Sequence, residues 1–563
     1  MLDNIDLKKL KQLNNDELDS LAEELRNYII EVVSKNGGHL ASNLGMIELT
    51  IALHKVFDAP HDKIIFDVSH QTYAHKILTG RKNDFKNLRK LNGISGFSKY
   101  SESEYDAYEA GHSSTAISAG LGYLEAKKND IDSIGHVVAV VGDASIVNGL
   151  SFEALNYITM HPDMKMIVIL NDNEMGISKN QATFNISELF SALGFEYYGI
   201  IDGHDILELT RYLEMSKNIR KSVVIHVKTK KGKGYLPAEN DKEGIWHGVN
   251  GFDIETGKIN FDENLTTYGK ELSSYLIDYV NKSKYGSKIR VITPAMSLGS
   301  GLDDFAKECE NNFIDVGLAE ENACLMAASM AHSGLTPIVF CYSTFLQRAY
   351  DEIVHDIARA NEHVIICIDH AGIVSNDGDT HQGIFDLGYL YSIPNMMILA
   401  PNDASSAISM MKYAIEEVNS PVVIRYSKEK ITHSNSIDKF IPKWICTGEG
   451  NKTIITYGVL YNEVKEFIND NNIKVKLVNA VTISPLDEEL LKDISNDDII
   501  VYEEVYQNGS LGDRIISYYN DLNIKTNVKR VSLKNTFLET GTRKELLEKY
   551  NISLDDLKKA IGD

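Results

Sequence analysis

A carboxylate and an amide follow two strongly apolar runs of this chain at a spacing that suits one divalent cation. Asp143 closely follows the run at residues 136–141, and Asn173 comes thirty positions later, after the run at residues 166–170. Mg²⁺ takes few protein oxygens and completes its shell with phosphate and water. We therefore predict a Mg²⁺–diphosphate site at Asp143 and Asn173, with the carbonyl of Met175 as a third ligand. Gly-Asp after an apolar strand is also a common turn, so the pair alone leaves that alternative open.

The elements that would position these residues alternate between strand and helix along the whole chain. Segments of helical periodicity separate the apolar, β-rich runs, which is typical of doubly wound α/β sheets. Ligands bind at the carboxyl ends of the strands in such sheets. We predict three α/β domains, at residues 1–255, 264–429 and 445–563, divided by polar stretches at 239–264 and 426–450. The expected strands are residues 63–68, 136–141, 166–170, 223–227, 290–293, 336–340, 364–368, 396–399, 422–425, 452–457, 474–479 and 498–503.

Composition excludes several classes of protein. With 563 residues, of which 43% are hydrophobic, the chain can form several domains that each have a core. The net charge of -23 and the lack of a basic stripe argue against a nucleic-acid partner. Five cysteines without a CxxC pair indicate reduced thiols. Because there is neither a membrane-length apolar run nor a signal-peptide core, we expect a cytoplasmic protein with no membrane partner.

Three short segments place histidines or small donors beside expected strand or helix ends. His70 follows the strand expected at 63–68, and His39 lies in a glycine-framed loop before a helix. The sequence Gly-His-Ser-Ser at 111–114 is expected to start a helix, whose backbone N–H groups favour phosphate. Simpler explanations stay open. Residues 111–114 could be only a helix N-cap and not a phosphate site, and a lone histidine is more often structural than catalytic.

Nine motifs occur in one order along the chain: GGHLASNLG (37–45), DVSHQTYAHKILTGR (67–81), GHSSTAISAGLG (111–122), LNDNEMGIS (170–178), DGHD (202–205), TKKGKGY (229–235), TPAM (293–296), YSTFLQRAYD (342–351) and DGDTHQGIFDLGYL (377–390). In this order they resemble the 1-deoxy-D-xylulose-5-phosphate synthase family of the thiamine-diphosphate-dependent transketolase superfamily. The resemblance runs from about residue 20 to the C-terminus. It implies a transketolase-like fold with a diphosphate-binding domain, a pyrimidine-binding domain and a C-terminal transketolase-type domain.

The resemblance also implies a reaction and its cofactors. Family members condense pyruvate, with loss of CO₂, and D-glyceraldehyde 3-phosphate to 1-deoxy-D-xylulose 5-phosphate, using thiamine diphosphate and Mg²⁺. This is the first step of the non-mevalonate isoprenoid precursor pathway, and it supplies thiamine and pyridoxal synthesis. Members of the superfamily are usually homodimers, so a homodimer is expected here.

Matching the motifs residue by residue assigns the cofactor contacts. Glu320 matches the acid that faces the pyrimidine ring, although Glu321 lies beside it and either could cap a helix. The metal ligands implied are Asp143, Asn173 and Met175. The other cofactor contacts implied are His70, Gly111, His112, Ser113, Ala144, Ser145, Tyr268 and Phe345.

The substrate-facing positions contain this chain's main departures from the family. His39 and His381 are expected to transfer protons, beside Tyr342, Arg348 and Asp377. Two arginines expected near the acceptor phosphate are His370 and Lys428 here. Arginine binds phosphate through two parallel hydrogen bonds and is always charged, unlike histidine or lysine. Asn322 and Ser297 also replace a histidine and an arginine, and the covering segment after Asn180 is short.

Three functional hypotheses follow from these observations. The first is a functioning synthase of this family. The second is a diverged paralogue that uses thiamine diphosphate for acyloin or ketol transfer to a less phosphorylated aldehyde. The third is a cofactor-binding pseudoenzyme, which would release no CO₂ from pyruvate.

Overall fold

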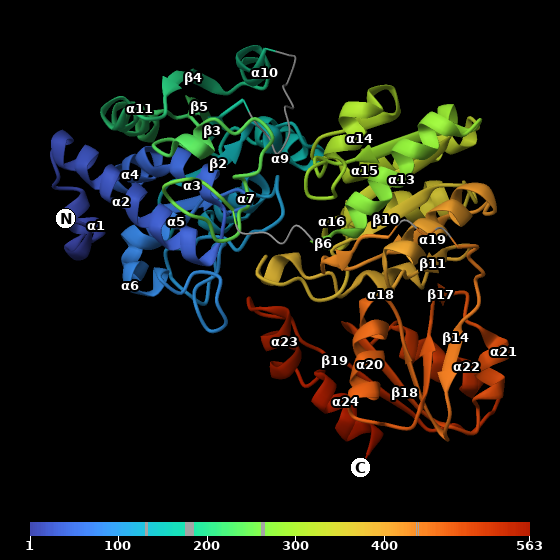
Figure 1. Cartoon of the computed structure of the whole chain (residues 1–563). Coiled ribbons are helices and arrows are strands. Elements are labelled where there is room, and N and C mark those ends of the chain that lie inside the picture. Colours follow the sequence, from blue (N-terminus) through green and yellow to red (C-terminus); the bar gives the residue numbers. More distant parts are fainter. Residues whose placement is uncertain (130–132, 175–184, 260–264, 435, 437, 563) are drawn as a thin grey trace. The chain divides into compact units, whose positions relative to one another are not determined.

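The computed structural model describes residues 1–129, 133–174, 185–259, 265–434, 436 and 438–562. The chain divides into two compact units, Met1–Phe261 and Asp262–Asp563. Figure 1 shows the helices and strands of each unit.

Within its described residues, the first unit contains a five-stranded parallel sheet with the order β1-β2-β3-β5-β4. The strands are β1 (Lys63–Phe66), β2 (Val137–Gly142), β3 (Ile167–Asp172), β4 (Glu196–Asp202) and β5 (Val223–Lys228). The helices are α1 (Leu7–Leu10), α2 (Asn15–Asn36), α3 (Leu40–Gly45), α4 (Ile47–Val56), α5 (Tyr73–Lys76), α6 (Lys82–Phe85), α7 (Ala116–Lys127), α8 (Asp143–Ile146), α9 (Gly149–Met160), α10 (Ile186–Ala192), α11 (Ile206–Asn218) and α12 (Leu236–Glu239).

Successive strand residues point to opposite sides of a sheet. In this sheet, residues on both sides are buried. Ile64, Val138 and Ile169 join a core with apolar residues of α2, α3, α4 and α11. Ile65 and Val168 join a second core with α7, α9 and α10. The near-continuous apolar runs in the sequence are therefore those of a parallel sheet covered on both sides.

Within its described residues, the second unit contains a seven-stranded and a five-stranded sheet, with a short antiparallel pair, β6 and β13. The strand orders are β17-β11-β12-β10-β9-β7-β8 and β14-β16-β15-β18-β19. Neighbours are parallel except β17 on β11 and β14 on β16. The strands are β6 (Leu265–Thr266), β7 (Ile289–Thr293), β8 (Phe313–Asp315), β9 (Thr336–Tyr342), β10 (Ile365–Asp369), β11 (Met397–Leu399), β12 (Val422–Arg425), β13 (Ile431–Thr432), β14 (Ile445–Gly448), β15 (Lys452–Thr456), β16 (Lys476–Asn479), β17 (Thr482–Ser484), β18 (Asp498–Tyr506) and β19 (Val528–Leu533).

The helices of the second unit alternate with these strands, and β17, from the C-terminal part of the chain, pairs with β11 of the seven-stranded sheet. The helices are α13 (Tyr268–Lys282), α14 (Asp303–Glu308), α15 (Glu320–His332), α16 (Ser343–Leu346), α17 (Tyr350–Glu352), α18 (Asp386–Leu390), α19 (Ala404–Glu416), α20 (Val459–Asp470), α21 (Glu488–Asp493), α22 (Leu511–Asp521), α23 (Arg543–Lys549) and α24 (Leu554–Ile561). Short 3-10 and π segments lie at Leu2–Asn4, Ile77–Arg81, Gly286–Lys288, Glu310–Asn312, Gln347–Ala349, Ile353–Ala358 and Asp379–His381.

The predicted α/β class is confirmed, because the described residues contain three mainly parallel sheets and every expected strand overlaps an observed one. The division into three domains stays a prediction. Strand β4 was not predicted, because it lies at the sheet edge and its residues are mostly only partly buried. The expected helix start at 111 was wrong. The helix begins at Ala116, and Ser114 has a φ of +71°, which is not helical.

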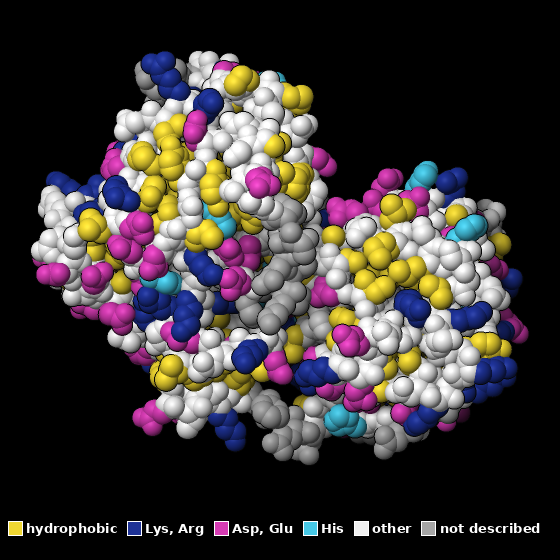
Figure 2. All heavy atoms as spheres, turned by 90° about the horizontal axis from the view of Figure 1, so that it is seen from above, with side chains coloured by type: hydrophobic (Ala, Val, Ile, Leu, Met, Phe, Trp, Pro, Cys, Tyr) yellow, Lys and Arg dark blue, Asp and Glu magenta, His cyan; other side chains and the backbone are white. Residues whose placement is uncertain are grey.

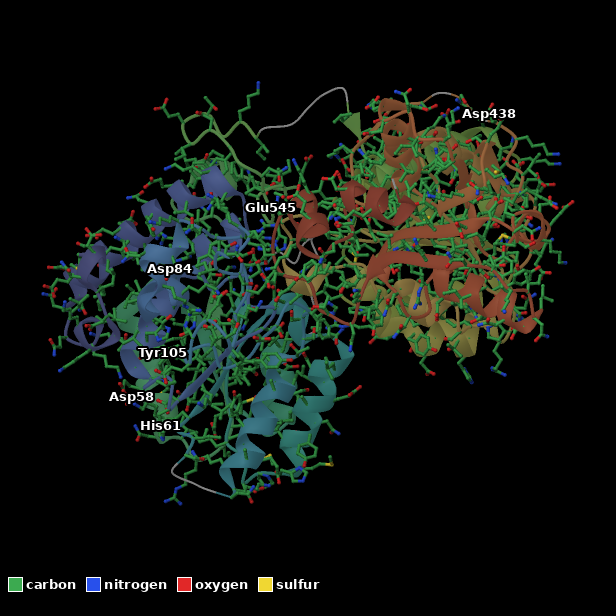
Figure 3. The ribbon with its side chains drawn as sticks, turned by 90° about the horizontal axis from the view of Figure 1, so that it is seen from below. Asp58, His61, Asp84, Tyr105, Asp438 and Glu545 are labelled. Carbon is green, nitrogen blue, oxygen red and sulfur yellow. The ribbon has the colours of Figure 1, made fainter. Side chains whose placement is uncertain are left out.

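Charged residues occupy the surface of both units. The side chains of Asp58, Asp84 and Glu545 are exposed (Figure 3). Among the described residues, no helix is both long enough and apolar enough to span a membrane.

Candidate active site

Acidic side chains gather at the carboxyl ends of the first three strands of the first unit. Asp143 directly follows β2, and Asp172 ends β3. Burial and the nearby Asp172 carboxylate raise the pKa of Asp143 to about 6. A Cβ added at Gly142 would meet no atom within 4 Å, so there is space beside the strand end. A divalent cation would stabilise this concentration of negative charge. Asn173 directly follows β3, and Met175 lies outside the described residues.

Asp67, just after β1, explains why helix α7 starts late. Its buried carboxylate accepts hydrogen bonds from the backbone N–H groups of Ser114 at 2.8 Å, Thr115 at 2.8 Å and Ala116 at 3.1 Å. These donors would otherwise be unsatisfied at the helix start. Burial raises the pKa of Asp67, and hydrogen bonds from Ser114 and from the Ser145 side chain oppose that shift. Asp67 thus joins two predicted cofactor-binding segments, one with Gly111, His112 and Ser113 and the other with Ala144 and Ser145.

Three histidines meet in the first unit. The ring centroid of His39 lies 5.1 Å from that of His70 and 5.6 Å from that of His247, and the last two are 5.1 Å apart. His39 and His70 were predicted as site residues. The sequence does not predict His247, because it lies in the polar stretch 239–264, which indicates a domain boundary.

The buried side chain of Asn43 fixes two of these histidine-bearing loops. Its Nδ2 donates to the carbonyl oxygens of His39 at 2.6 Å and His70 at 2.8 Å, while its Oδ1 accepts from the N–H of Tyr73 at 2.8 Å. Gly38 must be glycine here, because its φ is +146° and a Cβ would lie 2.7 Å from the Tyr73 hydroxyl. The side chain of Asn43 and the glycine at 38 therefore fix the backbone at His39 and His70.

Glu320, the first residue of α15, is a buried acid in the second unit, with a residue exposure of 2%. Burial raises its pKa, and Arg348 opposes that shift. Its Oε2 lies 3.7 Å from Nη1 of Arg348 and accepts no hydrogen bond from any described residue. Glu321 is only partly buried, and the N-cap of α15 makes no side-chain hydrogen bond. Of the two acids, Glu320 is the one suited to bind an incoming donor.

Four aromatic and imidazole rings contact one another near the end of β9. Tyr342 stacks on His370 at a centroid distance of 3.8 Å and lies 5.8 Å from Phe345. Phe345 in turn contacts the edge of His381 at 5.3 Å. Nδ1 of His370 lies 2.9 Å from Oδ1 of Asp369. The structure thus brings together Tyr342, Phe345, His370 and His381, all predicted from motifs.

The segment 372–383, which carries Asp377 and His381, is held by the C-terminal part of the chain. The N–H of Asn376 donates to the carbonyl of Gly541 at 3.1 Å, and the N–H of Arg543 donates to Ser375 Oγ at 3.3 Å. The Arg543 guanidinium binds two carboxylates, those of Glu463 and Glu504. Asp377 forms an ion pair with Lys428.

Tyr268 stands apart from these residues. It is buried in the core between α13 and α19, its hydroxyl donates to the carbonyl of Pro401 at 3.3 Å, and its ring stacks on Tyr426. A cofactor role for Tyr268 stays a prediction.

Strained backbone marks strand ends in both units. Val68 and Ser69 after β1, Glu174 after β3, Ala295 after β7 and His370 after β10 are non-glycine residues with φ between +56° and +66°. Such conformations are costly and concentrate at functional sites. No residue type at these positions signals the strain, so the sequence did not reveal it.

The chain is similar to known proteins along almost its whole length. A family model described as 1-deoxy-D-xylulose-5-phosphate synthase matches residues 2–187 and 181–229. Models of the transketolase pyrimidine-binding and C-terminal domains match residues 280–433 and 446–557. The chain is 40% identical to the 1-deoxy-D-xylulose-5-phosphate synthase of Macrococcus caseolyticus, over 97% of this chain and 96% of the relative. It is 38% identical to that of Clostridium tetani, over 99% and 98%. A transketolase structure from Campylobacter jejuni aligns with a TM-score of 0.44 and 18% identity, over 98% of this chain and 100% of that one.

Proposed function

This chain belongs to the 1-deoxy-D-xylulose-5-phosphate synthase family, and we propose here which of its residues carry out the family reaction. The enzyme is a thiamine-diphosphate-dependent transferase. It condenses pyruvate, with loss of CO₂, and D-glyceraldehyde 3-phosphate to 1-deoxy-D-xylulose 5-phosphate, which feeds isoprenoid precursor synthesis. The observation that best supports this function is the sequence identity of 38–40% to named synthases over nearly the full chain. The diverged-paralogue and pseudoenzyme hypotheses are not favoured by that similarity. The proposed domains are residues 1–255, 264–429 and 445–563.

The first unit would hold the diphosphate and Mg²⁺. Asp143 and Asn173 would be side-chain ligands and Met175 a carbonyl ligand. The raised pKa of Asp143 and the space beside Gly142 support a cation there. The backbone around Ser113, which Asp67 organises, would donate to phosphate oxygens. When bound, thiamine diphosphate supplies the electron sink for decarboxylation.

The second unit would hold the pyrimidine end. Glu320 suits the exchange of a proton with a ring nitrogen, because its Oε2 is buried and accepts no hydrogen bond from the described residues. Arg348 would keep its carboxyl oriented. Phe345 would stack on the pyrimidine ring, and its contact with the Tyr342 ring supports this role.

His39 and His381 would move protons, and the acceptor phosphate would meet His370 and Lys428. Lys428 is already paired with Asp377, so an incoming phosphate must compete with a carboxylate for this cation. His370 is buried between Tyr342 and Asp369. Both features predict weaker phosphate binding than two free arginines would give.

We also propose a cytoplasmic homodimer. Apolar side chains are exposed on α9, where Tyr157 is 40% and Met160 62% exposed, and on α15, where Leu325 is 46% exposed. Figure 2 shows hydrophobic side chains on the visible surface of both units. Such exposed groups suit contact with a second copy. The five cysteines are free, which supports a reducing compartment.

The decisive experiment is an assay of purified enzyme with pyruvate, thiamine diphosphate, Mg²⁺ and a panel of aldehydes. We expect CO₂ release and the highest kcat/KM with D-glyceraldehyde 3-phosphate. Higher kcat/KM with an unphosphorylated aldehyde would support the diverged paralogue. No CO₂ release would support the pseudoenzyme.

A further inference from the structure

Phe97 forms an apolar wall on the three-histidine cluster of the first unit. Its ring lies 5.5 Å from that of His39, edge to face, and the residue is 2% exposed. It belongs to the segment 95–99, which is neither helix nor strand and which we call the Phe97 loop. A loop without regular structure needs other contacts to hold an aromatic ring in one place.

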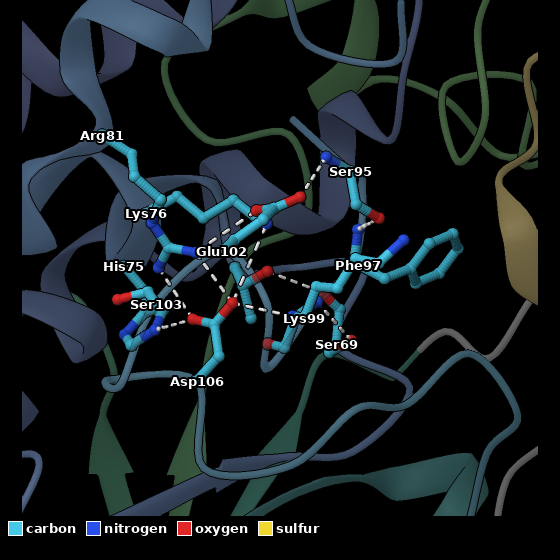
Figure 4. Close-up of polar contacts among 12 residues, drawn as sticks. Ser69, His75, Lys76, Arg81, Ser95, Phe97, Lys99, Glu102, Ser103 and Asp106 are labelled. Carbon is cyan, nitrogen blue, oxygen red and sulfur yellow. Dashed lines mark hydrogen bonds and ion pairs between the residues drawn. The ribbon is translucent and has the colours of Figure 1, made fainter. Parts of the chain in front are cut away.

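Two carboxylates fix the ends of the Phe97 loop. Glu102 Oε1 accepts from the N–H of Ser95 at 2.6 Å, and Asp106 Oδ2 accepts from the N–H of Lys99 at 2.7 Å (Figure 4). The N–H of Ser98 donates to Ser69 Oγ at 2.9 Å. Backbone groups on both sides of Phe97 are therefore tied down, one of them to the turn that carries His70.

The two carboxylates are held by two buried cations. Arg81 binds Asp106 through two hydrogen bonds of 2.7 Å, and Lys76 binds Glu102. We call Lys76, Arg81, Glu102 and Asp106 the four-charge cluster; its formal charges cancel. Burying such a cluster is costly compared with apolar packing, so its presence is better explained by a need for fixed geometry than by stability.

A histidine pair extends the four-charge cluster into helix α4. Nε2 of His75 lies 2.9 Å from Asp106, and its Nδ1 lies 2.8 Å from Nε2 of His54. Burial lowers the pKa of both imidazoles, so both are neutral near neutral pH. The histidine pair therefore adds no charge to the cluster near neutral pH.

We propose that Phe97 is a positioning residue for His39, and that the four-charge cluster holds its ring against the imidazole. This inference rests on the proposed function in one respect, the proton-transfer role of His39. The ring excludes water from one side of the imidazole and limits its rotation. Among the described residues, the titratable side chains of His70 and His247 face His39, and the Tyr73 hydroxyl accepts a hydrogen bond from the backbone N–H of His39 at 3.1 Å. An apolar wall generally disfavours the charged form of the titratable group beside it.

The test is a titration of the His39 imidazole by NMR in full-length protein with ¹³C-labelled histidine, loaded with thiamine diphosphate and Mg²⁺. The His39→Asn variant identifies the resonance. Because leucine is smaller than phenylalanine and leaves room for water beside the imidazole, we expect Phe97→Leu to raise the titration midpoint of His39 by about half a pH unit or more. Phe97→Tyr keeps an aromatic ring beside His39, and its titration midpoint should stay at the wild-type value. The matched control is Phe57→Leu, the same change at a buried phenylalanine that contacts His136 rather than His39.

Kinetics supply a second readout. Phe97→Leu should lower kcat several-fold and shift the pH profile of kcat, with the KM for pyruvate little changed. If Phe97 had only a structural role, Phe97→Leu would change these quantities no more than Phe57→Leu does. Glu102→Gln, which weakens only one end of the loop, should shift the His39 midpoint in the same direction. A midpoint in Phe97→Leu equal to those of wild type and Phe57→Leu overturns the inference. The midpoint is measured without turnover, so a wild-type enzyme that makes no deoxyxylulose phosphate refutes the proposed function and not the positioning by Phe97.

Discussion

Carboxylates near the candidate sites of the two units make different contacts. In the first unit, Asp67, Glu102 and Asp106 accept hydrogen bonds from backbone N–H groups, and so they fix the course of the loops. In the second unit, Glu320 and Asp377 face the side chains of Arg348 and Lys428. A side-chain pair can open when a charged ligand arrives, whereas a backbone-bound carboxylate cannot leave without disrupting its loop. The loops that Asp67, Glu102 and Asp106 hold in the first unit are therefore preorganised, whereas a charged ligand can displace the ionic partners of Glu320 and Asp377 in the second unit.

The largest expected effect is at the exchangeable acid of the second unit. Glu320→Gln removes the proton-exchanging group and should lower kcat by about 10²- to 10⁴-fold, while thiamine diphosphate and Mg²⁺ still bind. Steady-state kinetics and calorimetry measure the two quantities. Glu321→Gln is the matched control and should keep most of the activity. If the Glu321 variant is the inactive one, the roles of the two acids are reversed.

The next effect tests preorganisation in the first unit. Asp67→Asn cannot accept all three backbone N–H groups, and it should weaken thiamine diphosphate binding by roughly 1.5–3 kcal/mol, the range for hydrogen bonds to charged groups. Calorimetry in the presence of Mg²⁺ measures it. Asp62→Asn is the control, since Asp62 is also buried and accepts backbone N–H groups, from Asp58 and His136. Equal losses of affinity in both variants would argue against a specific role for Asp67.

Acid should weaken the first unit through its buried histidines. The pKa of His54 is well below 6.5 in the folded state because of burial. Below pH 6.5 the unfolded chain therefore binds more protons, and stability is lost as the pH falls. Between pH 7 and pH 5.5, wild type should lose about 1 kcal/mol of unfolding free energy relative to His54→Gln.

The two tryptophans allow each unit to be followed separately in that experiment. Trp246 lies in the first unit and Trp444 in the second, and both are buried. Urea unfolding of Trp444→Phe reports on the first unit through Trp246, and Trp246→Phe reports on the second. An effect of His54→Gln that is the same at both pH values would contradict the prediction.

The smallest expected effect concerns the acceptor phosphate. Lys428→Arg should lower the KM for D-glyceraldehyde 3-phosphate about two- to threefold, roughly 0.5 kcal/mol, because arginine can bind phosphate and Asp377 together. His370→Arg should act in the same direction. Kinetics with unphosphorylated glyceraldehyde are the control and should not change. An unchanged or raised KM for the phosphorylated substrate would count against a phosphate role for these positions.

Motif spacing predicted the sheets and much of the grouping of candidate residues, because apolar runs and strand-end residues are local in sequence. It predicted that His39 and His70 belong to a site, and that Tyr342, Phe345 and His381 do. It did not predict His247, Asn43 or the role of Asp67, since these act across loops distant in sequence. The late start of α7 was missed for the same reason, because its cap is supplied by Asp67 from the end of another strand. The assigned roles of the site residues stay predictions.

The attachment of segment 372–383 to Gly541 and Arg543 has a consequence for protein engineering. The C-terminal part of the chain is not an interchangeable module. A chimaera that takes residues 446–562 from a relative must also take the matching loop, or the grafted region will leave Asp377 and His381 without their support. Surveys of recombined enzymes from this family should therefore find functional crossovers before residue 372 more often than between 383 and 541.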